Sequence, residues 1–218
     1  MIESTTWIMK ASAIASQPEL SSVLARLMIS INDIAIAADA NDLWADETDA
    51  KRKPRQNAAR QYFVRILLSH VNEALEIVRE IAGNANLRAA VDKCDGRTVA
   101  DFKELETISN REREHFRKFR SRATFHYDKQ LPDRVLKEIS KNAPDQPWSY
   151  SMGRKPIDWK FELADAIIDR MVIREVMDLK IPKSAKRTEL TAEIAGRLQD
   201  ISRKYTSFAA HFVHRHCR

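Results

Sequence analysis

Apolar side chains recur every three or four residues along most of this chain, and this spacing constrains the fold more than any other feature. The clearest case runs from Pro54 to Ala82, and it is followed directly by Gly83 and Asn84, a typical stop at the carboxyl end of a helix. One face of this segment carries Phe63, Leu67, His70, Ala74, Ile77 and Ile81. Because 3.6 residues make one helical turn, we predict a long amphipathic helix there.

The same spacing predicts helices before and after this one. We expect them at residues 18–42, 54–82, 98–127, 131–141, 158–179 and 188–214, with a short region at 87–97. A break is expected near Ser109 and Asn110, and residues 41–55 and 144–156 are expected to be loops. No segment shows the strict alternation of an amphipathic strand. The predicted fold is therefore an all-α helical bundle of about six helices.

Length and composition are consistent with this fold. A chain of 218 residues fits a single helical domain, with a core at 18–142 and a C-terminal helical extension at 157–216. Only four glycines argue against phosphate-binding glycine loops. No stretch approaches 18 uninterrupted apolar residues, and the start lacks the features of a signal peptide, so we expect a cytoplasmic protein with no membrane span. Cys94 and Cys217 are expected to be reduced thiols.

The charge balance is basic, with a net charge of +6 and a pI near 9.4. Such a balance favours a polyanionic partner such as RNA, although mixed charges are also typical of an ordinary solvated helical surface. The basic residues concentrate at 51–55 and at 111–122. The second run contains Arg113, Arg117 and Lys118, which we predict to contact RNA.

A histidine closes this second basic run. An imidazole titrates near neutrality and can move a proton, and a guanidinium can hold a phosphate, so His126 and Arg120 together could cleave RNA without a metal. The alternative is a core histidine packed beside its aromatic neighbours. The neighbouring polar residues Ser121, Arg122, Tyr127 and Asp128 are candidates for supporting roles.

The phrase Arg-Ser-Arg-Ala-Thr-Phe-His-Tyr-Asp at 120–128 resembles the HEPN superfamily, in particular uncharacterised bacterial HEPN-like proteins. Active members of that superfamily carry Arg-x4-6-His, and here Arg120 and His126 enclose five residues. The resemblance implies a HEPN-like core and a metal-independent endoribonuclease without a cofactor. His126 would take the proton from a ribose 2′-OH, and Arg120, or Arg122 in its place, would stabilise charge on the phosphoryl oxygens. The products would be 2′,3′-cyclic phosphate and 5′-hydroxyl ends.

The resemblance also implies a homodimer, because active HEPN proteins generally build one cleft from two copies of the motif. It implies a role in phage defence or a toxin-type stress response, with a neutralising protein as a further partner. Family members usually carry Asn, Asp or His after the arginine, where this chain has Ser121. The subgroup regulated through a tyrosine reads Arg-x4-His-x-Tyr, where this chain has Asp128 at the tyrosine position. The alternative function is therefore a non-catalytic HEPN-like module that binds RNA or a protein.

The sequence contains three other groupings that include a histidine. Arg65 and His70 repeat the motif spacing, but on a helix their side chains would point about 140° apart. His70 and Glu73 are one turn apart, so they either form an ordinary pair with a neighbour at the edge of the core or line the same cleft and orient Arg120 or His126. As a metal site for a hydrolase this pair lacks further ligands. At the C-terminus His211, His214 and Cys217 have one-turn spacing, but the interleaved arginines favour a tail without metal.

Overall fold

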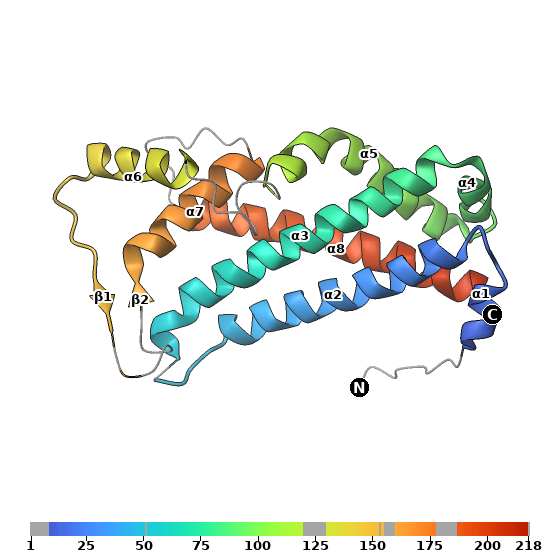
Figure 1. Ribbon diagram of the computed structural model, residues 1–218, viewed down its shortest axis with the longest axis horizontal. Helices are drawn as coiled ribbons and strands as arrows, with labels where there is room; N and C mark the ends of the chain where they lie inside the picture. The colour runs from blue at the N-terminus through green and yellow to red at the C-terminus, as the bar shows by residue number, and fades with distance from the viewer. Residues whose placement is uncertain are drawn as a thin grey trace.

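Four long helices form the body of the protein in the computed structural model, which describes residues 9–50, 52–119, 130–152, 154, 160–177 and 187–217. Helices α2 (Ser21–Ala45), α3 (Gln56–Gly83) and α8 (Arg187–His216) run along the length of the molecule, and α5 (Gly96–Phe119) packs against α3 and α8 (Figure 1). Each amphipathic helix covers the apolar face of its neighbours, which gives an elongated bundle.

Shorter elements lie at the two ends of this body. At one end α6 (Gln130–Asn142) packs on α7 (Glu162–Met177), and strands β1 (Tyr150–Ser151) and β2 (Lys160–Phe161) form an antiparallel pair in which Tyr150 is opposite Phe161 (Figure 1). At the other end lie α1 (Ala11–Ala15) and α4 (Ala85–Val91). A 3-10 turn, η1 (Lys53–Arg55), leads into α3, and its proline occupies one of the first positions, where no backbone N–H is needed.

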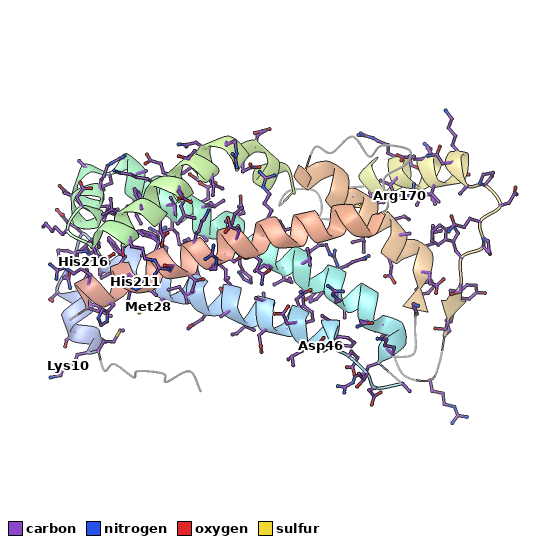
Figure 2. The ribbon with its side chains drawn as sticks, turned by 180° about the vertical axis from the view of Figure 1, so that it is seen from behind. Lys10, Met28, Asp46, Arg170, His211 and His216 are labelled. Carbon is purple, nitrogen blue, oxygen red and sulfur yellow. The ribbon has the colours of Figure 1, made fainter. Side chains whose placement is uncertain are left out.

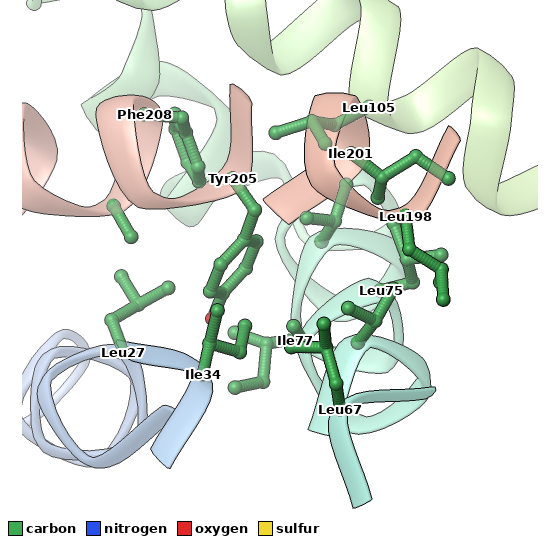
Figure 3. Packing of buried hydrophobic residues seen from close by; sticks show 14 of the residues in the cluster. Leu27, Ile34, Leu67, Leu75, Ile77, Leu105, Leu198, Ile201, Tyr205 and Phe208 are labelled. Atoms are coloured by element: carbon green, nitrogen blue, oxygen red, sulfur yellow. The ribbon is translucent and has the colours of Figure 1, made fainter. Parts of the chain in front are cut away.

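The core is one continuous cluster that all four long helices share. In Figure 3, Leu27 and Ile34 of α2 point toward Tyr205 of α8, and Leu105 of α5 lies above Ile201. The Tyr205 ring is 1 % exposed, and its hydroxyl lies 2.5 Å from Ser30 Oγ. Ser30 donates its own proton to the Leu27 carbonyl, so Tyr205 is the donor in this pair. Helix α8, predicted as part of a C-terminal extension, thus packs into the same core as residues 18–142.

The all-α prediction is confirmed, and six helices in the described part of the chain are longer than ten residues. Several boundaries differ from the prediction. The first long helix extends to Ala45, three residues beyond its predicted end at residue 42, and the polar loop expected from residue 41 begins at Asp46. Helix α5 runs unbroken through Ser109, because this side chain is buried and donates to the Glu106 carbonyl at 2.9 Å. The expected irregular segment at 144–156 contains strand β1.

Helix α2 has the length and composition that could cross a membrane, with a mean hydropathy of 1.4 over its most apolar window and 33 % of that window buried. The expectation that no segment spans a membrane was based only on the length of uninterrupted apolar runs. In α2 the apolar residues are interrupted by one or two polar side chains at a time, such as Ser30 and the pair Asn32 and Asp33, so the average is high without a long run.

Candidate functional site

Helix α5 carries the second basic run toward the candidate catalytic motif. Arg113, Arg117 and Lys118 lie on its last two turns, and α5 ends at Phe119. The motif itself, with Arg120, Ser121, Arg122, His126, Tyr127 and Asp128, lies outside the described residues. The roles predicted for these residues therefore stay predictions. The structure describes α5, the helix that leads into the motif.

A buried carboxylate fixes α5 to α8 eight residues before the start of the motif at Arg120. Glu112 of α5 is 5 % exposed, and its Oε1 accepts from Nε of Arg111 at 2.9 Å. Arg197 of α8 contacts the same oxygen through Nη2. We call these three residues the α5–α8 ion cluster. Two guanidinium groups share one carboxylate, so the cluster carries a net charge of +1.

The surroundings of this cluster favour a further anion. Burial lowers the pKa of Arg197, and repulsion from Arg111 lowers it further. Both arginine side chains nevertheless reach solvent, because Arg111 is 65 % and Arg197 38 % exposed. A phosphate that approached from solvent could contact both guanidinium groups while Glu112 holds them in place.

A second contact holds the same part of α5 from the side of α3. Arg79 of α3 donates through Nη1 to the carbonyl of Ser109 at 2.9 Å. Its Nε donates to Glu76 at 3.0 Å, which keeps the arginine side chain extended toward α5. Residues 109–112 therefore contact both α3 and α8, and these contacts hold this part of α5 in place.

His70 and Glu73 lie near the middle of α3. His70 Nδ1 is 3.6 Å from Asp33 Oδ2 of α2, and the histidine side chain is 31 % exposed. Glu73 is exposed. The contact to Asp33 agrees with a histidine paired with a neighbour at the edge of the core. A role for either residue in orienting Arg120 or His126 stays a prediction.

Two exposed aromatic rings lie on the β1–β2 pair. Tyr150 is 71 % and Phe161 50 % exposed, and their rings are nearly parallel, at 8° with centroids 6.2 Å apart. Met152, next along the chain, is 64 % exposed. Lys160, the first residue of β2, pairs with Glu162 at 3.1 Å. Exposed parallel rings beside a cation are a typical surface for stacking unpaired bases.

The C-terminal histidines lie at the opposite end of the bundle from Arg170 of α7 (Figure 2). His211 contacts the Ser207 carbonyl at 2.7 Å, whereas His216 donates to the Ala90 carbonyl at 3.2 Å. Burial lowers the pKa of His216, and the nearby cations Arg215 and Lys93 lower it further. No three His, Cys, Asp or Glu side chains of the described residues form a metal-binding group, so the metal site that the spacing allowed is not formed there.

Beside His216 is a surface pocket of about 390 Å³, whose lining includes Gln17, Lys93 and Arg215. Gln17 donates to the carbonyl of His216 at 2.8 Å, which satisfies one of the terminal carbonyls of α8. The pocket is lined by residues of the opposite end of the bundle from the β1–β2 pair. Cys94 and Cys217 near this end are both free thiols, in agreement with the prediction.

The α5–α8 ion cluster was not predicted from the sequence, although one sign of it is present there. Glu112 lies four residues after Ile108 and four before Phe116, which is the position of an apolar residue in the helical stripe of α5. An acid at such a position is expected to be buried with a cationic partner. The partner, Arg197, lies 85 residues away, and no local pattern identifies it.

Comparisons of this chain with models of protein families, with curated proteins and with solved structures found no match. The HEPN resemblance is carried by residues 120–128 of the sequence.

Proposed function

We propose that this protein binds RNA at the carboxyl end of α5 and cleaves it without a metal ion. In this proposal His126 is the general base, Arg120 stabilises the transition state, and Arg122 is the local alternative to Arg120. Ser121, Tyr127 and Asp128 would position the reacting groups. Arg113, Arg117 and Lys118 would contact the RNA backbone ahead of the cleaved bond.

The observation that carries the proposal is the charge of the α5–α8 ion cluster. Arg111 and Arg197 share the single buried carboxylate of Glu112, and both are open to solvent. The cluster thus adds positive charge from a second helix to the basic run that leads into Arg120. A chain of phosphates is the ligand that such a row of cations attracts.

The chemistry needs only groups that this chain carries. His126 would remove the proton of a ribose 2′-OH as that oxygen attacks the adjacent phosphorus. The bond from phosphorus to the 5′-oxygen breaks, and the 5′-oxygen takes a proton from water or from the protonated histidine. Arg120 would bind the phosphoryl oxygens as their charge increases. DNA has no 2′-OH and should not be cut.

The exposed rings of Tyr150 and Phe161 support a preference for single strands. Unpaired bases expose their faces, and aromatic side chains stack on them regardless of sequence. The bases of a duplex are already stacked on one another, so the rings would gain little from contact with double-stranded RNA.

The test is a gel assay of RNA cleavage in excess EDTA, with His126→Ala and Arg120→Ala beside the parent protein. His211→Ala and Arg97→Ala are matched controls, because both residues are exposed and far along the bundle from the end of α5. We expect the parent and both controls to cleave RNA and both motif variants to be inactive but folded. A parent that binds RNA without cutting it would favour the non-catalytic module, and a parent that does neither would contradict the proposal.

A further inference from the structure

The outward face of α2 carries a line of exposed aliphatic side chains. Ile29, Ile36 and Leu43 are 59 %, 69 % and 68 % exposed. They are seven residues apart, and seven residues turn a helix by about 700°, which is about 20° short of two full turns. The three side chains therefore project in nearly the same direction, and we call them the α2 stripe.

The α2 stripe is separate from the side of the helix that enters the core. Leu27 and Ile34 point toward Tyr205 of α8 (Figure 3). Ile36 is two residues beyond Ile34, so it projects about 160° away from it. Among the described residues only Leu136 is a further exposed Leu or Ile, so the exposed aliphatic surface is concentrated on α2. Aligned exposed apolar side chains of this kind mark an interaction surface.

One cation, Arg26, lies three residues before Ile29 and pairs with Glu80 of α3 at 2.6 Å, and the charges beyond it are all negative. Residues 27–50 contain no Lys or Arg, although the whole chain has a net charge of +6. Asp33 and Asp39 are three residues on either side of Ile36, so they lie about 60° to each side of it on the helix. The other acids of this segment are Asp42, Asp46, Glu47 and Asp49.

Part of this negative charge is balanced, because Glu47 pairs with Arg52 at 2.9 Å. Asp33 lies 3.6 Å from His70. Asp39, Asp42 and Asp46 form no ion pair with any other residue that the structure describes. An apolar line bordered by acids matches the apolar face and cationic borders of a basic amphipathic helix.

We propose that the α2 stripe docks an amphipathic helix with basic flanks from another protein. A second copy of this chain fits poorly, because antiparallel pairing centred on Ile36 would place Asp33 of one copy opposite Asp39 of the other. A membrane surface fits poorly as well, because anionic headgroups repel the acids. The α2 stripe offers one aliphatic side chain in every seven residues. Asn32 lies between Ile29 and Ile36, and Asp39 lies between Ile36 and Leu43, so the contact is weaker than a full coiled-coil seam.

The test uses two labelled three-heptad peptides with leucine at both seam positions, one with lysine and one with glutamate at the flanking positions. Fluorescence anisotropy measures their binding to the full-length protein. We expect the lysine peptide to bind about tenfold or more tightly than the glutamate peptide. Ile36→Ser should weaken its binding by about tenfold or more, because Ile36 is at the centre of the stripe. Asp39→Asn combined with Asp42→Asn should reduce the salt dependence of binding.

Leu136→Ser is the matched control, since Leu136 is 41 % exposed on α6 and lies off the stripe. It should bind the lysine peptide like the parent, and circular dichroism should show all variants folded. Equal binding of the two peptides, or equal loss in the control, would contradict the proposal. So would two other results: dimers of the protein alone that Ile36→Ser dissociates, and binding to neutral phosphatidylcholine vesicles that Ile36→Ser removes. The first would assign the stripe to a second copy and the second to a lipid surface.

Discussion

Arg197 of α8 contacts the buried carboxylate of Glu112 on α5, although the two residues are 85 positions apart in the sequence. The contact joins the last helix of the bundle to the helix that leads into the candidate motif. Arg111 binds the same carboxylate oxygen from the neighbouring position on α5. The pair therefore both holds α5 in place and adds charge to its basic end.

We predict that substitutions of Arg197 and of Glu112 lower the free energy of unfolding by different amounts. Arg197→Met removes a cation that contacts the buried Glu112 carboxylate, and should cost about 2 kcal/mol of unfolding free energy. The partial exposure of Arg197 keeps this below the cost expected for a fully buried pair. Glu112→Gln removes the buried charge itself and should cost only about 1 kcal/mol. Urea unfolding of both variants measures the difference, and a larger loss for Glu112→Gln would show that the carboxylate is not the costly group to leave unpaired.

The buried hydroxyl of Tyr205 predicts a loss of stability in alkali. Burial raises the pKa of Tyr205 to about 12. An unfolded tyrosine ionises near pH 10, so the folded state holds this proton more tightly, and its stabilisation is complete below about pH 10. That stabilisation is lost as the pH rises from about 10 to 12, by up to about 1.4 kcal/mol per pH unit.

Tyr205→Phe separates this contribution from the other groups that titrate in alkali. The variant should lose about 1 kcal/mol at pH 7, because the hydrogen bond to Ser30 is gone. Its stability should then fall less steeply than that of the parent between about pH 10 and 12. Urea unfolding across this range is the measurement, and parallel pH profiles for parent and variant would refute the prediction.

The α5–α8 ion cluster also predicts the salt dependence of RNA binding. Arg111→Gln should weaken binding to all single-stranded sequences alike and reduce the slope of log affinity against log salt by about 0.7, the value for one phosphate contact. Arg97→Gln, at the opposite end of the same helix, should leave the slope unchanged. Anisotropy titrations at several salt concentrations give both slopes. Identical slopes for parent and Arg111→Gln would show that Arg111 does not contact an RNA phosphate.

The exposed aromatic rings of the β1–β2 pair predict a contribution to RNA binding that does not depend on charge. Tyr150→Ala should weaken binding to single-stranded RNA by about 1–3 kcal/mol, with little change in binding to duplex RNA. Because Tyr150 is 71 % exposed, its removal should leave the thermal midpoint nearly unchanged. Leu136→Ala, another exposed apolar residue, is the control. Equal losses on single and double strands would argue against base stacking.

Regular helical spacing allowed most of the fold to be predicted from the sequence. The segment containing Phe63, Leu67 and Ile81 is helical as expected, because one apolar face satisfies both the helical period and burial. The break expected in α5 was wrong, because Ser109 satisfies its hydroxyl within the helix and is fully buried. The strand containing Tyr150 was missed, because two residues are too few to show alternation.

Less of the candidate site than of the fold could be predicted from the sequence. The motif and the basic run are local patterns, so they could be recognised without a structure. The partner of Glu112 depends on how α8 packs against α5, which no local pattern contains. The exposure of Tyr150 and of the α2 stripe likewise follows from packing, because an isoleucine such as Ile36 has the same identity in a core and on a surface.

The most direct test of the account uses a single-stranded DNA oligonucleotide with one ribonucleotide, incubated with the protein in excess EDTA. The account predicts a single cut directly after that ribonucleotide, with a 2′,3′-cyclic phosphate on one product and a 5′-hydroxyl on the other, and no cut by His126→Ala. Cleavage at deoxynucleotides, dependence on a metal ion, or full activity in His126→Ala would contradict it.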